Sequence, residues 1–277
     1  MKKILVPVDF SEHSEYAMEV AAQLAKKYDA EIVTLHMMGL SEAILTKDDS
    51  QEAFEAIYYM KLAEKRFGEF LDRDYLKGIK ITSTVQNYKI FKEMDSLARE
   101  YDADLIVMGS HGSSGVREVF VGSNTEKVVR TSTVPVLVIK NRAMNFTVDK
   151  MVFACDFSPE YIPAFKKAKE LADMFDSTFQ LLYINTPERF MRSSEMTART
   201  FDFLTQAADG NIDLYDSIQY YCDKTIEEGI FSFSSDYNID VIAIPTHGRR
   251  GLAHFFAGSI GEELVNHSDI PVLTFKI

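Results

Sequence analysis

Glycines gather in two short stretches of the sequence, and each stretch has the composition of a phosphate-binding loop. The first, MGSHGSSGVREVFVGS, covers residues 108–123, and the second, IPTHGRRGLAHFFAGS, covers residues 244–259. A residue without a Cβ lets the backbone approach a ligand closely or take a positive φ. A helix would then begin at Gly122 and Ser123, and the free N–H groups and partial positive charge of its N-terminus suit phosphate. The hydroxyl of Thr125 lies within the same first turn.

The glycine stretches also have a purely structural interpretation. Glycines between a strand and a helix often serve only the turn, and a serine at a helix start is often only a cap. The spacing is not the dinucleotide pattern GxGxxG, and no GK[ST] follows as in a P-loop. The glycines alone therefore leave both interpretations open.

Asp9 closes the first apolar run, where its carboxylate could accept hydrogen bonds from a ribose or an amino group. His111 and His247 occupy matching positions beside the glycines; each either contacts phosphate or acts as a base, or bonds only to its own loop. The sequence has no GxSxG, HExxH or CxxC pattern. Phosphoryl transfer needs a positioned nucleophile as well as charge stabilisation. We therefore expect no catalytic residues and at most slow hydrolysis of a bound nucleotide.

A pattern of alternating strands and helices positions these residues, and it occurs twice. Asp9-Phe10-Ser11 returns as Asp156-Phe157-Ser158, an offset of 156 − 9 = 147, and Gly112 returns as Gly248, an offset of 248 − 112 = 136. Strands that alternate with helices predict a parallel sheet covered on both faces, with ligands beyond the carboxyl ends of the strands. We predict two doubly wound α/β domains. They cover residues 1–143 and 148–277.

Local patterns predict the individual elements of each copy. Ser11 is an expected N-cap, and in the second copy Ser158 is the cap with Pro159 at the first helical position. A helical pattern within residues 41–77 either packs on the sheet or serves as a lid or an oligomer face. The expected strands of the first copy are 4–8, 31–37, 79–85, 104–108 and 134–140, with helices after residue 11, at about 90–101 and near 123–130.

Composition excludes several classes of partner and location. The net charge of −12 opposes binding to nucleic acid or to acidic membranes. No apolar run approaches the roughly 20 residues of a membrane span, and Asp9 interrupts the first run too early for a signal peptide. The two cysteines are expected to be small buried hydrophobes in a reducing compartment. We expect a cytoplasmic protein without nucleic-acid or membrane partners.

The order of these motifs resembles the universal stress protein family in its ATP-binding form. Asp9-Phe10-Ser11 follows the first strand, His36-Met37 follows the second, and Gly109-x2-Gly112-x9-Gly122-Ser123 follows the fourth. The segment EKVVRTSTVPVLVIK is also similar to that family, and the resemblance covers nearly all of the chain as a tandem pair. It implies a five-stranded parallel sheet in each domain, of the adenine nucleotide α-hydrolase-like kind. It also implies that strands 134–140 and 271–276 pair edge to edge in an internal pseudo-dimer. Whether two such chains associate further as a homodimer is left open.

The resemblance implies that the first domain binds ATP, with Mg²⁺ or Mn²⁺ bridging its phosphates. The adenine would lie near Asp9 and Met37, the ribose near Pro7 and Gly109, and the phosphates at residues 112 and 122–125. The nucleotide would be the regulatory ligand of a stress-response protein. The implied binding residues are Pro7, Val8, Asp9, Met37, Met108, Gly109, His111, Gly112, Gly122, Ser123, Asn124 and Thr125.

The second copy departs from the pattern and is expected to bind nucleotide more weakly or not at all. Pro245 stands where the first copy has Gly109, and it has no N–H and a fixed φ. Arg249 either reaches phosphates through charge-assisted bonds or remains a solvated loop residue. A weak ATPase or autophosphorylating enzyme, and a nucleotide-free scaffold for protein partners, remain alternatives. The candidate residues retained in this copy are Asp156, Gly248, Arg249, Gly258 and Ser259.

Overall fold

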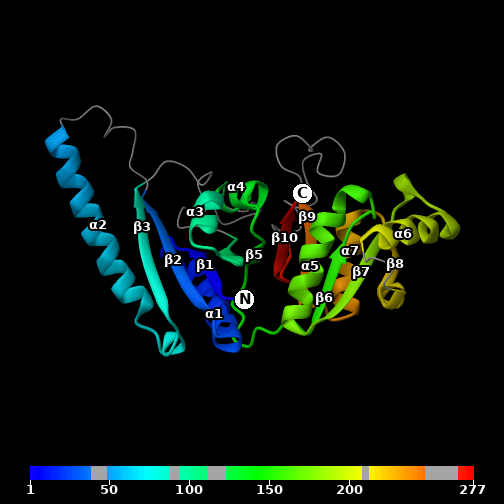
Figure 1. Cartoon of the computed structure of the whole chain (residues 1–277), viewed down its shortest axis with the longest axis horizontal. Coiled ribbons are helices and arrows are strands. Elements are labelled where there is room, and N and C mark those ends of the chain that lie inside the picture. Colours follow the sequence, from blue (N-terminus) through cyan, green and yellow to red (C-terminus); the bar gives the residue numbers. More distant parts are fainter. Residues whose placement is uncertain (39–48, 88–93, 111–122, 208–211, 247–267) are drawn as a thin grey trace. The chain divides into compact units, whose positions relative to one another are not determined.

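The structure is a computed structural model of the 277-residue chain. It describes residues 1–38, 49–87, 94–110, 123–207, 212–246 and 268–277 (Figure 1). The described residues divide into two compact units. The first comprises those up to residue 128 together with 139–146, and the second comprises 129–138 and 147–277.

The first unit carries four parallel strands in its described part, β1 (Lys3–Pro7), β2 (Glu31–Met38), β3 (Ile81–Asn87) and β4 (Leu105–Gly109). Hydrogen bonds place them in the order β3-β2-β1-β4, of which Figure 1 labels β3, β2 and β1. The side chains of Ile4, Leu5 and Val6 are fully buried, as expected for a strand covered on both faces. The helical segments are α1 (Glu12–Tyr28), α2 (Asp49–Leu71), η2 (Asp74–Leu76), α3 (Met94–Glu100) and the start of α4 (Ser123–Thr131).

Six strands belong to the second unit among the described residues. They are β5 (Val136–Ile139), β6 (Lys150–Ala154), β7 (Thr178–Asn185), β8 (Ile218–Cys222), β9 (Val241–Thr246) and β10 (Val272–Lys276). Their hydrogen-bonded order is β5-β10-β9-β6-β7-β8. All pairs are parallel except β5 and β10, where Leu137 faces Leu273 in an antiparallel register. The helical segments are η4 (Pro159–Tyr161), α5 (Ile162–Phe175), η5 (Pro187–Arg189), α6 (Ser193–Ala207), η6 (Ile212–Ser217) and α7 (Ile226–Asp236).

The ten strands therefore form the mostly parallel α/β architecture that the sequence predicts. The predicted pairing of segments 134–140 and 271–276 is confirmed by the β5–β10 register. Each predicted strand of the first copy is present, with ends that differ by at most two residues. The helix predicted at about 90–101 is α3, but residues 88–93 lie outside the described part.

Left-handed residues recur at matched positions in the two copies, which confirms the internal repeat from the backbone. Phe10 has φ 63° and Phe157 has φ 57°, at the offset of 147 residues. Asp102 has φ 51° and Asn238 has φ 52°, at the offset of 136 residues. Non-glycine residues seldom adopt this conformation, so its recurrence marks the same turns.

Two local predictions have different outcomes at the helix starts. Ser11 caps α1, because its hydroxyl accepts a hydrogen bond of 3.3 Å from the backbone N–H of Ser14. Ser158 precedes the short η4 and its side chain makes no cap bond, so that prediction is wrong. The Ser158 hydroxyl instead accepts a hydrogen bond of 2.7 Å from Arg199.

The helix predicted within residues 41–77 is α2, and its C-terminal half packs on the first unit. Phe67 and Phe70 are buried, whereas Ile57, Tyr58 and Met60 are exposed. Packing on the sheet is therefore confirmed for one face of the helix. Across the described part of the chain, no helix is both long enough and apolar enough to span a membrane.

Candidate functional site

The first unit brings several predicted binding residues to the carboxyl ends of neighbouring strands. β1 lies between β2 and β4, so the order of the strands reverses at β1. Ligands of such sheets usually bind beyond the carboxyl ends of the strands at this point. Pro7 to Asp9 end or follow β1, Met37 lies near the end of β2, and Gly109 ends β4. The predicted convergence of Pro7, Val8, Asp9, Met37, Met108 and Gly109 at one edge thus agrees with the topology.

The Asp9 carboxylate is held in a tight turn. Its Oδ1 accepts hydrogen bonds from the backbone N–H of Ser11 at 3.0 Å and from the Ser11 hydroxyl at 2.6 Å. The intervening Phe10 is left-handed and packs on His36, with ring centroids 4.6 Å apart. The Nδ1 atom of His36 lies 2.7 Å from the carbonyl oxygen of Val8. The turn after β1 is therefore fixed by β2 as well as by α1.

Gly109 has a packing reason that is independent of any ligand. A Cβ at this position would lie 2.7 Å from both the carbonyl carbon and the oxygen of His13, in the first turn of α1. Contacts below 3.0 Å with backbone require a shift of the chain, so α1 can approach β4 only because residue 109 has no side chain.

Thr125 connects the first turn of α4 to the end of β4. Its buried hydroxyl donates a hydrogen bond of 2.9 Å to the carbonyl oxygen of Gly109. Because the hydroxyl proton of Thr125 is engaged in this hydrogen bond, its oxygen can only accept further hydrogen bonds or bind a cation. Asn124 is exposed in the same turn, and Ser123 begins the helix. The N-terminus of α4 thus lies at the carboxyl end of β4, as the sequence predicts.

Seven predicted site residues lie outside the described residues, so their placement stays a prediction. They are His111, Gly112, Gly122, Gly248, Arg249, Gly258 and Ser259.

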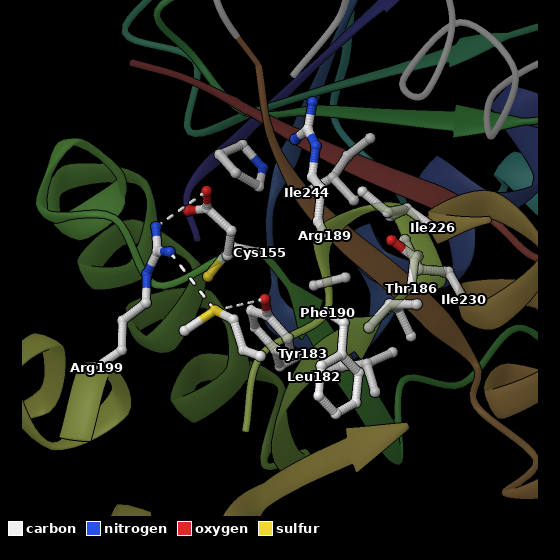
Figure 2. A pocket seen from close by; sticks show the side chains of 15 residues that line it. Cys155, Leu182, Tyr183, Thr186, Arg189, Phe190, Arg199, Ile226, Ile230 and Ile244 are labelled. Atoms are coloured by element: carbon white, nitrogen blue, oxygen red, sulfur yellow. Dashed lines mark hydrogen bonds and ion pairs between the residues drawn. The ribbon is translucent and has the colours of Figure 1, made fainter. Parts of the chain in front are cut away.

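The second unit contains a cavity of about 280 Å³ at the carboxyl ends of β6, β7 and β9 (Figure 2). It occupies the position that corresponds to the predicted site of the first unit, since Asp156 and Pro245 both line it. The remaining lining residues are Ala154, Cys155, Leu182, Tyr183, Ile184, Thr186, Arg189, Phe190, Met191, Arg199, Ile226, Ile230 and Ile244.

An ion pair occupies one side of this cavity. Arg199 of α6 lies 3.2 Å from the Asp156 carboxylate, an ion pair drawn as a dashed line in Figure 2. Arg199 also donates to the Ser158 hydroxyl. The Asp156 carboxylate further accepts a hydrogen bond of 2.8 Å from the backbone N–H of Ser158. The carboxylate of the second copy is therefore already engaged by a cation and by its own turn.

The loop after β7 covers another side of the cavity and is anchored by one amide. The buried Asn185 side chain accepts from the backbone N–H of Met191 at 2.9 Å and donates to its carbonyl oxygen at 3.0 Å. The Tyr183 hydroxyl donates to the sulfur of Met191 at 3.0 Å. Between these anchors the loop carries Arg189 and Phe190, and the Phe190 ring is 70% exposed.

Gly229 allows α7 to form the apolar wall. A Cβ there would lie 2.6 Å from the Ile184 side chain, so α7 approaches β7 closely only because residue 229 is a glycine. Ile226 and Ile230 of the same helix line the cavity as a result. Their branched side chains and Ile184 make this wall fully apolar.

The remaining polar groups of the lining are neutral at physiological pH. Burial raises the pKa of the Cys155 thiol well above its usual range. Burial likewise raises the pKa of the Tyr183 hydroxyl. Among the lining residues that the structure describes, the charge therefore comes from Asp156, Arg189 and Arg199.

Sequence reasoning missed the residues that α6 and the preceding loop contribute, above all Arg199, Arg189 and Asn185. A signal for Arg199 exists in the sequence. Met196, Thr200 and Phe203 form the buried face of α6, and Arg199 lies beside that face. An arginine at such a position indicates an ion-pair partner within the fold.

A metal centre formed by protein side chains alone has no support in the described residues. Within them, no group of three or more His, Cys, Asp or Glu side chains is arranged to hold a metal ion.

Comparisons with known proteins place both halves of the chain in one family. The model of the Universal stress protein family matches residues 1–140 and again residues 147–276. A universal stress protein of Methanocaldococcus jannaschii is 30% identical over 152 residues, which are 50% of this chain and 82% of that protein. A second one from the same organism is 30% identical over 155 residues, covering 51% of this chain and 96% of that protein.

A solved structure has the same overall fold over the whole chain. A universal stress protein from Archaeoglobus fulgidus DSM 4304 aligns with a TM-score of 0.68 at 21% identity, covering 99% of this chain and 98% of that chain. At this identity the likeness concerns the fold alone. Since the family model matches twice and covers nearly every residue, the chain belongs to the universal stress protein family and is a tandem of two family domains.

Proposed function

We propose that this chain is a cytoplasmic stress-response protein whose first domain binds ATP as a regulatory ligand. The observation that carries the proposal is the intact glycine pattern of the first copy, together with the position of its ends. Gly109 ends β4 beside Asp9, and Thr125 of α4 bonds to Gly109. This arrangement supports a ligand that extends from the carboxylate turn to the helix N-terminus.

The residues present fit such a ligand in part. The backbone N–H groups of the first turn of α4, with the exposed Asn124, would hold phosphate oxygens. The Thr125 oxygen would act as an acceptor or as a metal ligand, because its proton is already donated to Gly109. A divalent ion, Mg²⁺ or Mn²⁺, would neutralise phosphate charge when bound, and oxygen donors of this kind suit it.

A calorimetric titration with Mg-ATP tests the proposal in a pair of matched variants. Gly122→Val puts a branched side chain at the predicted phosphate position of the first copy, and Gly258→Val makes the same change in the second copy. We expect the first variant to abolish ATP binding and the second to preserve it. In a thermal melt, a ligand at a hundredfold excess over its Kd stabilises the native chain by about 2.7 kcal/mol.

Three other outcomes discriminate the alternatives. An unchanged melt at millimolar Mg-ATP would contradict the proposal and favour the nucleotide-free scaffold. Phosphate release that disappears in Gly122→Val would indicate a weak ATPase at the same site. One solved universal stress protein, 23% identical over 50% of this chain with a TM-score of 0.34, is in complex with cAMP. The titration therefore includes cAMP as a competing ligand, and a preference for it would replace ATP in the proposal.

A further inference from the structure

The cavity of the second unit combines apolar walls with an excess of positive charge. Eleven of its fifteen lining residues are apolar or aromatic. Among the described lining residues, two arginines and one aspartate give a net charge of 2 − 1 = +1. An apolar space beside a guanidinium suits a molecule that has an apolar body and one anionic group.

The two arginines have different roles. Arg199 lies against Asp156 and Ser158, so its guanidinium is fixed as part of the cavity wall. Arg189 reaches the lining from η5, a different element, and is exposed (Figure 2). A planar guanidinium presents parallel N–H donors that match the two oxygens of a carboxylate. Because its side chain is more exposed than that of Arg199, Arg189 is the arginine of the lining that an incoming anion would reach.

The features that favour a nucleotide in the first copy are altered here. Asp9 has its counterpart in Asp156, whose carboxylate is engaged by Arg199 at 3.2 Å. Gly109 has its counterpart in the buried Pro245, which has no N–H to offer and projects a ring into the lining. The ion pair at Asp156 works against an adenine, and the ring of Pro245 works against a ribose and leaves an apolar surface in its place.

We propose that the second domain binds a compact organic anion, with an apolar body about the size of one aromatic ring and one carboxylate against Arg189. The cavity volume of about 280 Å³ lies just below the usual range of ligand pockets, about 300 to 1,000 Å³, which favours a small ligand. This ligand differs in class from the nucleotide proposed for the first domain, so the two proposals stand or fall separately.

The loop that carries Arg189 is held in place for this task. Asn185 binds both backbone groups of Met191, and the N–H of Arg189 donates to the carbonyl oxygen of Thr186 at 3.2 Å. A loop that is ordered before binding loses less conformational freedom on binding. The exposed ring of Phe190, on the same loop, offers apolar surface that a ligand would cover.

Isoleucine-methyl NMR of the full chain tests the proposal, with phenylacetate as probe and phenylacetamide as its neutral isostere. Ile184, Ile226, Ile230 and Ile244 line the cavity, so their signals report on it directly. We expect phenylacetate to shift these signals saturably and to bind about tenfold more tightly than phenylacetamide, because only the anion gains a charge-assisted bond.

A matched pair of variants assigns the charge. Arg189→Gln is expected to reduce the preference for phenylacetate over phenylacetamide to less than about threefold. Arg192→Gln removes an equal charge from the same loop outside the lining, where Arg192 lies 3.7 Å from Glu195. This control is expected to keep the preference. Both side chains are exposed, so both variants are expected to fold.

Four results with the two probes would overturn the proposal. These are shifts confined to isoleucines of the first unit, no saturable shift with phenylacetate, equal affinities for the acid and the amide, and an unchanged preference in Arg189→Gln. Displacement of phenylacetate by Mg-ATP with shifts of the same four isoleucines would also overturn it, since the cavity would then be a nucleotide site. Loss of ATP binding in Gly122→Val leaves all of these readouts unaffected, so failure of one proposal is distinguishable from failure of the other.

Discussion

The turns after β1 and β6 have the same backbone but use their side chains differently. In both turns, a phenylalanine with left-handed backbone follows an aspartate. The aspartate carboxylate accepts a hydrogen bond from the backbone N–H two residues later, at 3.0 Å for Asp9 and 2.8 Å for Asp156. The hydroxyl of Ser11 donates to Asp9 and caps α1, whereas the hydroxyl of Ser158 accepts from Arg199. One arginine from a distant helix thus changes the chemistry of a turn whose geometry is conserved between the copies.

The ends of β4 and β9 show the same principle. Gly109 is required by the close approach of α1 to β4, while Pro245 fills the corresponding position with a ring that lines the cavity. The two copies therefore differ in the packing around these strand ends, while their order of strands is the same.

The largest expected effect comes from exchanging side chains at these strand ends. Gly109→Ala forces a Cβ to within 2.7 Å of the His13 backbone and is expected to lower the free energy of unfolding by about 1–3 kcal/mol. Pro245→Ala removes ring carbons from a cavity wall and is expected to cost about 1 kcal/mol. Urea unfolding measures both. Equal costs, or a larger cost for Pro245→Ala, would contradict the comparison.

A second pair of variants compares two buried hydroxyls that have no hydrogen-bond partner within the described residues, Tyr75 in the first unit and Ser234 in the second. Removing either hydroxyl, by Tyr75→Phe or Ser234→Ala, is expected to raise the free energy of unfolding by about 1 kcal/mol at neutral pH.

Of these two side chains, only Tyr75 makes the free energy of unfolding depend on pH. Burial raises the pKa of Tyr75 to about 12, above its unfolded value of 10.0. The folded chain therefore holds this proton more tightly, so the free energy of unfolding is highest below pH 10 and falls by about 1–2 kcal/mol as the pH rises towards 12. Tyr75→Phe should flatten that alkaline decline and Ser234→Ala should not. A decline of equal steepness in both variants would refute the assignment.

The smallest effect is expected at the ion pair of the second cavity. A double-mutant cycle with Asp156→Asn and Arg199→Met should give a coupling free energy of about 0.5–1 kcal/mol, because the Arg199 side chain is 36% exposed and solvent screens the pair. The coupling should shrink in high salt. A coupling near zero at low salt would mean that Arg199 does not fix the Asp156 carboxylate.

Local sequence patterns predicted the fold well because its determinants are local and occur twice. The run Ile4–Val6 is fully buried, and Ala17, Val20, Ala21 and Leu24 of α1 form the inward face that helical spacing indicated. The repeat itself located both turns after the first strand of each copy. Predictions that depended on one serine were less reliable, since the Ser158 hydroxyl had a competing partner in Arg199.

The candidate sites were predicted only where they coincide with strand ends. Asp9 and Gly109 could be placed because parallel strands end at one edge of the sheet. The ion pair of Asp156 with Arg199 could not, since the partners are 199 − 156 = 43 residues apart and no periodicity links them. The same holds for Asn185, whose two bonds to Met191 depend on the path of an irregular loop.

The antiparallel pairing of β5 with β10 affects how the two copies can diverge in sequence during evolution. The family match assigns β5 to the first domain, yet its residues 136–138 group with the second unit. A covalent tether keeps such a strand at millimolar effective concentration, whatever amount of protein is made. Two copies held in one chain can accumulate different substitutions, whereas in a homodimer every substitution alters both copies at once.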